Sequence, residues 1–323
     1  MEIRSMTNKI YAGIDVSKDY LDVHLSDCRR MRKKNISSGI KLIVELFKTS
    51  AVYLVVVEAT GGYEQKLVEA LQVEGVAVSV VNPSRTKSFA RSLGRNAKSD
   101  LLDAEILCLF GERMNPVRTK PLDEATKELK SLILRREQLV ETLTAEKNRL
   151  KAPVITEEVR MSVEEVVHFI NKQIKTLNQK IKTKISDNND FSNKNQLLQN
   201  IQGVGQTTSA TLIALLPEIG KINRKQIAAL VGVAPFNKES GRYSGKRSVY
   251  GGRTHVRAVL YMATMTAIRM NPCFKNFFLR LVQAGKNGKV AIVACMRKLL
   301  ITLNAMVRDG KQWSSDRYLT QHI

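Results

Sequence analysis

Apolar and polar positions alternate along much of the first hundred residues, in short runs separated by polar turns. In the segment 10–16, Ile10, Ala12 and Ile14 fall on one face and Asp15 on the other, which is typical of a strand. Longer apolar runs, such as 53–58, indicate strands buried on both faces. Helices are predicted over 39–47 and from the turn at 59–62 to about residue 74. The predicted strands span 10–16, 20–26, 31–36, 53–58 and 76–81.

The order of these elements limits the fold class. Three strands, a helix, a strand, a helix and a further strand make up the order of an α/β ribonuclease-H-like sheet. A helix expected to begin after Ser99 would pack on this sheet, because an apolar set including Leu101, Ile106 and Phe110 runs along it. Ser99 has the side chain of a helix N-cap.

Four carboxylates fall at the ends or edges of these elements. Asp15 lies in the first strand, Glu58 ends the fourth predicted strand, and Asp100 and Asp103 share one face of the helix that follows Ser99. Taken singly, each could be a turn, strand-end or first-turn charge facing solvent. Together they predict a site with oxygen ligands only, which suits Mg²⁺ or Mn²⁺ and phosphodiester chemistry.

The middle of the chain predicts two long amphipathic helices. Apolar residues recur at heptad spacing from Leu129 to Leu150, with polar interruptions, and Pro153 ends the run. A second stripe follows from Val163 to Ile181. The pair is interpreted as an antiparallel hairpin or as a dimerising coiled coil, and the polar segment 186–195 as a hinge.

The last part of the chain is expected to be mainly helical, over 207–216, 254–270, 272–284 and 290–307. The sequence Ile201-Gln202-Gly203-Val204-Gly205 resembles the hairpin of helix-hairpin-helix modules, in which glycines let backbone N–H groups approach a phosphate. Between the helices, 232–253 is a loop rich in glycine and cations.

Charge favours a polyanionic partner. The chain carries 52 Lys and Arg against 30 Asp and Glu, a net charge of +22, and no acid occurs from Ser240 to Arg308. With 6% aromatic residues, a membrane-surface role is disfavoured, and Arg297 and Lys298 interrupt the most apolar late stretch, so no membrane span is expected. The four cysteines form no CxxC pair and are interpreted as buried thiols in a reducing compartment.

Three segments carry a specific resemblance. Gly13-Ile14-Asp15-Val16-Ser17-Lys18, Val57-Glu58-Ala59-Thr60-Gly61 and Lys98-Ser99-Asp100-Leu101-Leu102-Asp103-Ala104 resemble the acidic signatures of the insertion-sequence 110 family of transposases, which includes the pilin-gene-type invertases. Glu239-Ser240-Gly241, with the Gly/Arg-rich stretch and the helix after it, is similar to that family's C-terminal transposase domain. The resemblance extends over nearly the whole chain.

This resemblance implies a RuvC-like first domain with an Asp-Glu-Asp-Asp metal site on Asp15, Glu58, Asp100 and Asp103, and a nucleophilic serine at Ser240. It also implies a structured noncoding (bridge) RNA and a homo-oligomer, a dimer that becomes a tetramer in the synaptic complex. The candidate nucleic-acid contacts are Lys98, Gly203, Gly205, Arg242, Lys246, Arg247, Arg253, Arg257, Lys286 and Lys289.

The sequence therefore predicts a cytoplasmic, nucleoid-associated DNA transposase built from a catalytic domain (8–120), a helical coiled-coil linker (121–190) and a C-terminal domain (196–323). Three alternatives remain open at this point. A site-specific invertase of the same family would share every motif. A hydrolytic junction resolvase would use only the carboxylates, and a non-catalytic nucleic-acid-binding protein would need only the charge.

Overall fold

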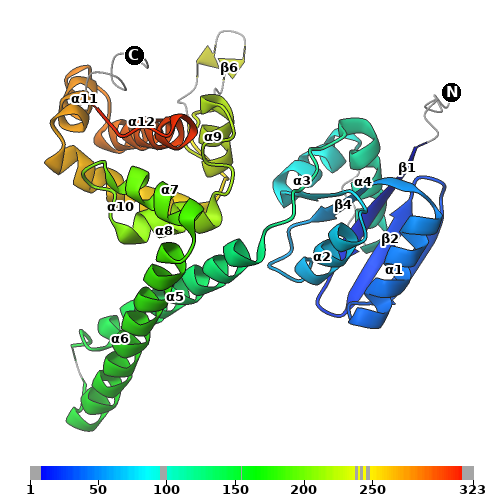
Figure 1. Ribbon diagram of the computed structural model, residues 1–323, viewed down its shortest axis with the longest axis horizontal. Coiled ribbons are helices and arrows are strands. Elements are labelled where there is room, and N and C mark those ends of the chain that lie inside the picture. The colour runs from blue at the N-terminus through cyan, green and yellow to red at the C-terminus, as the bar shows by residue number, and fades with distance from the viewer. Residues whose placement is uncertain are drawn as a thin grey trace. The chain divides into compact units, whose positions relative to one another are not determined.

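The computed structural model describes residues 9–94, 100–153, 155–236, 239–240, 243–244 and 248–314, without the side chains of 100–102, 239–240 and 243–244. The chain divides into two compact units, Met1–Pro121 and Leu122–Ile323 (Figure 1). The predicted border between the helical linker and the C-terminal domain falls within the second unit, and that three-part division stays a prediction.

The first unit is built on a five-stranded mixed sheet with the strand order β3-β2-β1-β4-β5. The strand β1 pairs antiparallel with β2 and parallel with β4, and β5 extends the parallel half. This is the arrangement expected of a ribonuclease-H-like domain. The strands are β1 (Ile10–Val16), β2 (Tyr20–Leu25), β3 (Arg30–Lys34), β4 (Val52–Glu58) and β5 (Val78–Val81).

Each face of the sheet has its own apolar core, because side chains alternate along the strands. Ala12, Ile14 and Val16 of β1 belong to the core that includes residues of α1 and α2, whereas Tyr11 belongs to a second core with Leu107 of α4. The helix α3 also contacts α4. These helices are α1 (Ser37–Thr49), α2 (Gln65–Val73), α3 (Pro83–Ser92) and α4 (Asp100–Met114).

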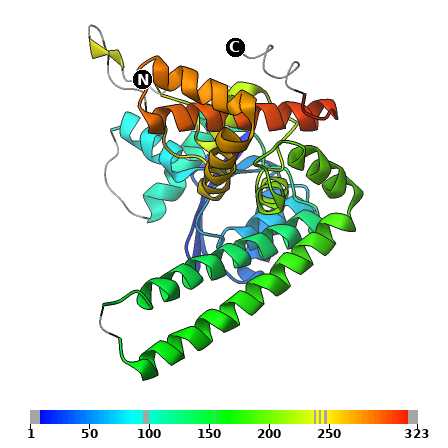
Figure 2. The same cartoon turned by 90° about the vertical axis from the view of Figure 1, so that its left-hand side faces the viewer.

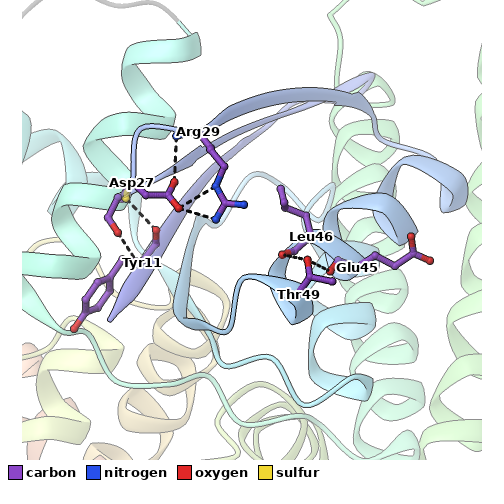
Figure 3. A network of polar contacts seen from close by, with 8 residues as sticks. Tyr11, Asp27, Arg29, Glu45, Leu46 and Thr49 are labelled. Carbon is purple, nitrogen blue, oxygen red and sulfur yellow. Dashed lines mark hydrogen bonds and ion pairs between the residues drawn. The ribbon is translucent and has the colours of Figure 1, made fainter. Parts of the chain in front are cut away.

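The turn between β2 and β3 is held by a compact polar network (Figure 3). Asp27 accepts hydrogen bonds from the Arg29 backbone and guanidinium, and the latter contact holds the pKa of Asp27 below its usual value. The backbone N–H of Tyr11 donates to the Ser26 hydroxyl at 3.0 Å. The start of β1 is therefore fixed to this turn.

The second unit begins with two long helices, α5 (Glu124–Arg149) and α6 (Glu157–Ser186), which pack side by side (Figure 2). Lys184 pairs with Glu128, and Arg136 donates to Asn178. The two helices therefore run antiparallel. Within one chain the two helices form the antiparallel hairpin. A coiled coil between copies stays a prediction.

The remaining helices of the second unit share a core with α5 and α6, so the mostly helical character predicted for this half of the chain is confirmed. In addition, His255 Nδ1 lies 2.7 Å from Glu137 Oε2, and burial raises the pKa of Glu137 despite that contact. The helices are α7 (Asn189–Gln199), α8 (Gln206–Leu215), α9 (Arg224–Val231), α10 (Thr254–Met270), α11 (Pro272–Gln283) and α12 (Gly288–Asp309).

Two expectations need correction. The segment 186–195, interpreted as a polar hinge, is mostly helical, because α7 begins at Asn189 and the Asn188 side chain accepts the Phe191 N–H at its N-terminus. Cys28 is exposed, although Cys108 and Cys295 are buried as expected. Among the described residues, one helix, α12, is long and apolar enough to cross a membrane. Because 56% of its most apolar 18-residue stretch is buried inside the fold, it resembles a core helix, and the expectation of no membrane span is not overturned.

Candidate active site

Asp15 and Glu58 occupy neighbouring positions at one end of the parallel strand pair. The register pairs Gly13 with Val56 and Ile14 with Val57, and its next step places Asp15 beside Glu58. Paired residues of neighbouring strands project to the same face and lie about 4.8 Å apart along the hydrogen-bonding direction. Both carboxylates are on the face that carries Tyr11 and Val56, which is the face packed against α4. The sheet itself thus brings two predicted site residues together.

The helix α4 approaches β1 so closely that only a glycine fits between them. A β-carbon on Gly13 would lie 2.1 Å from the Ala104 carbonyl oxygen and 2.3 Å from the Cys108 backbone nitrogen. Asp103, which precedes Ala104, is therefore carried on a turn that lies directly over the strand containing Asp15. Asp100 is the first residue of α4, and its side chain lies outside the described residues, as do Lys98 and Ser99.

The Glu58 carboxylate has a partner that the sequence did not indicate. The hydroxyl of Thr86, a buried residue of α3, donates a hydrogen bond to Glu58 Oε1. The loop after Glu58 is held as well, because Glu64 Oε2 accepts the backbone N–H groups of Thr60 and Gly62 at 3.0 and 2.9 Å. The end of β4 is thus fixed on both sides of Glu58.

Asp22 is a further acidic residue on this face. It pairs with Asp15 across β1 and β2, is 2% exposed, and has its Oδ2 3.1 Å from an Arg32 guanidinium nitrogen. Asp22, Asp15 and Glu58 therefore form a row across three adjacent strands. The alternation of Leu21 and Val23 with Asp22 is the sequence signal that could have identified it.

The donor chemistry of this face suits a hard divalent cation, since its predicted ligands are carboxylates. Within the part of the chain that the structure describes, no group of three or more His, Cys, Asp or Glu side chains is arranged to hold a metal ion. The Asp100 side chain lies outside the described residues and is not among these groups. Cys108 is no alternative ligand, because burial raises the pKa of its thiol to about 12.

Ser240 lies in a short hairpin in the second unit. The strands β6 (Glu239–Ser240) and β7 (Tyr243–Ser244) pair antiparallel, with Ser240 opposite Tyr243. The Ser240 side chain and residues 241–242 lie outside the described residues. The sequence predicted a glycine-rich loop here and did not identify the two strands.

Backbone contacts between glycines fix both ends of this loop. Gly232 ends α9 in the left-handed conformation, with φ 78°, and a β-carbon on it would lie 2.1 Å from the Gly251 carbonyl oxygen. A β-carbon on Gly252 would lie 2.3 Å from the Gly232 nitrogen. Nearer the hairpin, the Phe236 N–H donates to the Ser248 carbonyl at 2.9 Å. Backbone contacts therefore join the chain before the hairpin to the chain after it.

The predicted nucleic-acid contacts of this unit have different surroundings. Arg253 donates to both carboxylate oxygens of Glu218 and to the Leu215 carbonyl, which favours a structural role. Arg257 donates to the Gly251 carbonyl. Gly203, with φ 107°, packs against the backbone of α10. Gly205 precedes α8 with open space beside it, and Lys286 and Lys289 are exposed. Arg242, Lys246 and Arg247 lie outside the described residues.

Comparisons with known proteins match the two halves of the chain to two family models, the first of which extends beyond the first unit into α5 and α6. Residues 12–157 match a DEDD-type IS110 family model described as a transposase, and residues 195–279 match a second model described as the transposase IS116/IS110/IS902 family. The pilin gene-inverting proteins of Moraxella lacunata and Moraxella bovis are each 28% identical over 316 residues, which cover 94% of this chain and 97% of theirs. The IS900 uncharacterized 42 kDa protein of Mycobacterium paratuberculosis is 35% identical over 86 residues, 26% of this chain and 21% of that protein.

Proposed function

Since this chain belongs to the IS110 family of transposases, we propose that it is a DNA recombinase that cuts and rejoins strands through Ser240 and the carboxylates of a RuvC-like first unit. The observation that supports this proposal is the register of β1 and β4, which pairs Ile14 with Val57 and whose continuation would bring Asp15 beside Glu58 on the face covered by α4. Ser240 lies in the hairpin of β6 and β7, opposite Tyr243.

The carboxylates are assigned to a metal. Asp15, Glu58, Asp100 and Asp103 would hold Mg²⁺ or Mn²⁺, which when bound would supply charge neutralisation at the reacting phosphate. The protein's own contribution is positional. The close packing at Gly13 sets the height of the first turns of α4 over β1, and Thr86 fixes the Glu58 carboxylate by a hydrogen bond.

The serine is assigned to strand transfer. The bond from Ser240 Oγ to phosphorus forms as the bond to a DNA oxygen breaks, and the serine proton is balanced by protonation of that leaving oxygen. A DNA hydroxyl then attacks the same phosphorus and restores the serine. Each step exchanges one phosphoester bond for another, so no external energy source is required.

Three further parts of the proposal follow family membership. We assign a structured noncoding (bridge) RNA and DNA as the polyanionic partners of a chain with a net charge of +22. We also assign a homo-oligomer, a dimer that becomes a tetramer on paired DNA sites. Inversion is a second candidate for the native reaction, because the two Moraxella relatives that cover nearly the whole chain are named as pilin gene-inverting proteins.

The test is to denature a stalled reaction on end-labelled DNA and to follow the label. Wild-type protein should carry label as a covalent adduct, and Ser240→Ala should bind DNA without forming the adduct. Ser248→Ala, a matched change at the base of the same hairpin, should retain it. Efficient DNA cutting by wild-type protein with no adduct would replace this proposal with a hydrolytic resolvase.

The carboxylates need a separate test. Asp15→Asn and Glu58→Gln should each lower strand exchange by about a thousandfold, or about 4 kcal/mol of transition-state stabilisation, with folding retained. Glu45→Gln, on the exposed surface of α1, is the control and should have no effect. Recombination near the wild-type rate from both variants would contradict the carboxylate assignment.

A further inference from the structure

The helix α3 presents a surface of cations and serines. Residues spaced by three and four positions lie on one face of a helix, and on α3 this rule groups a set that is exposed throughout. The set consists of Ser84, Lys87, Ser88, Arg91 and Ser92. We call it the α3 face. Its side chains are either long cations or short hydroxyls, so an extended polyanion could lie close to the helix between the cations.

The opposite side of α3 is attached to the candidate active site. Thr86 is 2% exposed and donates its hydroxyl hydrogen bond to the Glu58 carboxylate. Phe89 packs edge-on against Phe110 of α4, with ring centroids 5.4 Å apart. The Arg85 guanidinium lies over the same Phe110 ring at 5.4 Å. The position of the α3 face relative to the carboxylates is therefore fixed by packing.

The sequence around α3 carries cations and no acids. No Asp or Glu occurs from Gly75 to Ser99, while that stretch contains five Lys and Arg residues. Within the described residues, neither Lys87 nor Arg91 forms an ion pair. Arg253 of the second unit differs, because its guanidinium is taken up by Glu218. The cations of the α3 face are free to bind an external anion.

We propose that the α3 face binds the sugar–phosphate backbone of the DNA strand whose phosphate reaches the carboxylates of the first unit. Lys87 and Arg91, one helical turn and about 6 Å apart, contact phosphates, and Ser88 between them permits the close approach. Carboxylates repel a polyanion, so a site of this kind needs cations beside it. This inference rests on the proposed function only for the identity of DNA as the substrate.

Cross-linking tests the position of the strand without any DNA cleavage. Ser88→Cys is made in a Cys28→Ser background, because Cys28 is the exposed native cysteine among the described residues. The probe is a single-stranded DNA oligonucleotide of mixed sequence with an activated thiol on one backbone phosphate. Ser88→Cys should form the disulfide about tenfold faster than the matched control Ser38→Cys, which is exposed on α1. High salt should remove the difference.

The charge is tested by Lys87→Gln with Arg91→Gln, against Lys41→Gln with Lys66→Gln on α1 and α2. Removing two phosphate contacts to a single strand should lower the slope of log affinity against log salt by about 1.4, so the loss of affinity should be roughly sevenfold greater at 50 mM than at 200 mM salt. Lys87→Arg with Arg91→Lys, which keeps both charges, should behave as the wild type does.

Three results would overturn the inference. The first is equal cross-linking from Ser88→Cys and Ser38→Cys, and the second is cross-linking to an RNA probe but not to DNA. The third is an unchanged salt slope in the double glutamine variant, with hydrogen exchange showing α3 intact. None of these results contradicts the serine and carboxylate chemistry. Absence of the covalent adduct would contradict that chemistry and would leave these binding measurements valid.

Discussion

Replacing Gly13 by alanine should separate the geometry of the carboxylate site from the stability of the rest of the chain. The new β-carbon would lie 2.1 Å from the Ala104 carbonyl oxygen, whereas ordinary contact begins at 3.4 Å. The helix α4 must therefore move away from β1 by about 1.3 Å, because the obstructing atoms belong to its backbone. Asp103 moves with the helix, and Asp15 stays with the strand.

The displacement sets the expected magnitude. A misplacement of about 1 Å in a catalytic constellation costs roughly a hundredfold in rate, so strand exchange by Gly13→Ala should fall by at least that factor. Overpacking of this kind costs about 1–3 kcal/mol, more than the gain of below about 1 kcal/mol from replacing glycine within a strand. Amide hydrogen exchange of α4 should quicken, while peptides of the second unit keep their protection.

Alanine substitutions at two other glycines serve as controls for Gly13→Ala. A β-carbon on Gly111, also in α4, would meet a Val56 methyl group at 2.9 Å, and a side chain can give way. Gly288 has no neighbour within 4 Å. Gly111→Ala should have a small effect and Gly288→Ala none. If Gly13→Ala exchanged strands and protected its α4 amides as the wild type does, the close approach would not be what positions Asp103.

Two more changes test individual contacts. Thr86→Val removes the hydroxyl that donates a hydrogen bond to Glu58. Because a hydrogen bond to a charged group contributes about 1.5–3 kcal/mol, the recombination rate should fall roughly tenfold to a hundredfold while DNA affinity is unchanged. Thr86→Ser should restore the rate. A rate that Thr86→Ser fails to restore would point to packing. Arg253→Gln should lower the stability of the second unit by about 1 kcal/mol at neutral pH without changing the salt dependence of DNA binding. Burial raises the pKa of Glu218, but the hydrogen bonds and charge of Arg253 outweigh it and hold the pKa below 4.5. A carboxyl with a lowered folded-state pKa stabilises above its unfolded pKa, so the difference between wild type and Arg253→Gln should shrink as pH falls below about 4.5 in urea titrations. A difference that is independent of pH would exclude this ion pair as its source.

The elements of the first unit were predictable where burial imposes a period on the sequence. All five strands were found, because β1, β2, β4 and β5 contribute alternate or continuous apolar residues to a core, and β3 adds Met31 at its edge. The helix α3 was missed for the opposite reason. Thr86 is its one buried residue, so α3 has no apolar stripe, and no element was predicted between the strand at 76–81 and the helix after Ser99. Asn82 in fact accepts the Ser84 N–H as a helix cap.

Partners across the fold were the least predictable features of the site. Asp15 and Glu58 could be placed from the strand order, but the hydrogen bond from Thr86 joins residues 28 positions apart. Gly13 gave no signal, since a glycine within a strand does not identify the helix that passes over it. Arg253 lies in a cationic loop and was predicted to contact phosphate. Its hydrogen bonds to Glu218, 35 positions away, could not be predicted from the sequence.

The location of the charge, more than its total, bears on how the first unit can act. A site of converging carboxylates must attract a phosphate diester although both are anionic. Cations near Asp15 and Glu58 would neutralise those carboxylates if they could reach them, as Arg32 does at Asp22. On α3, binding of the Glu58 carboxylate and attraction of DNA are assigned to opposite sides. The buried side donates a hydrogen bond from a neutral hydroxyl to Glu58, and the exposed side carries the unpaired cations Lys87 and Arg91. The helix can therefore draw in a strand without occupying the carboxylates that are to act on it.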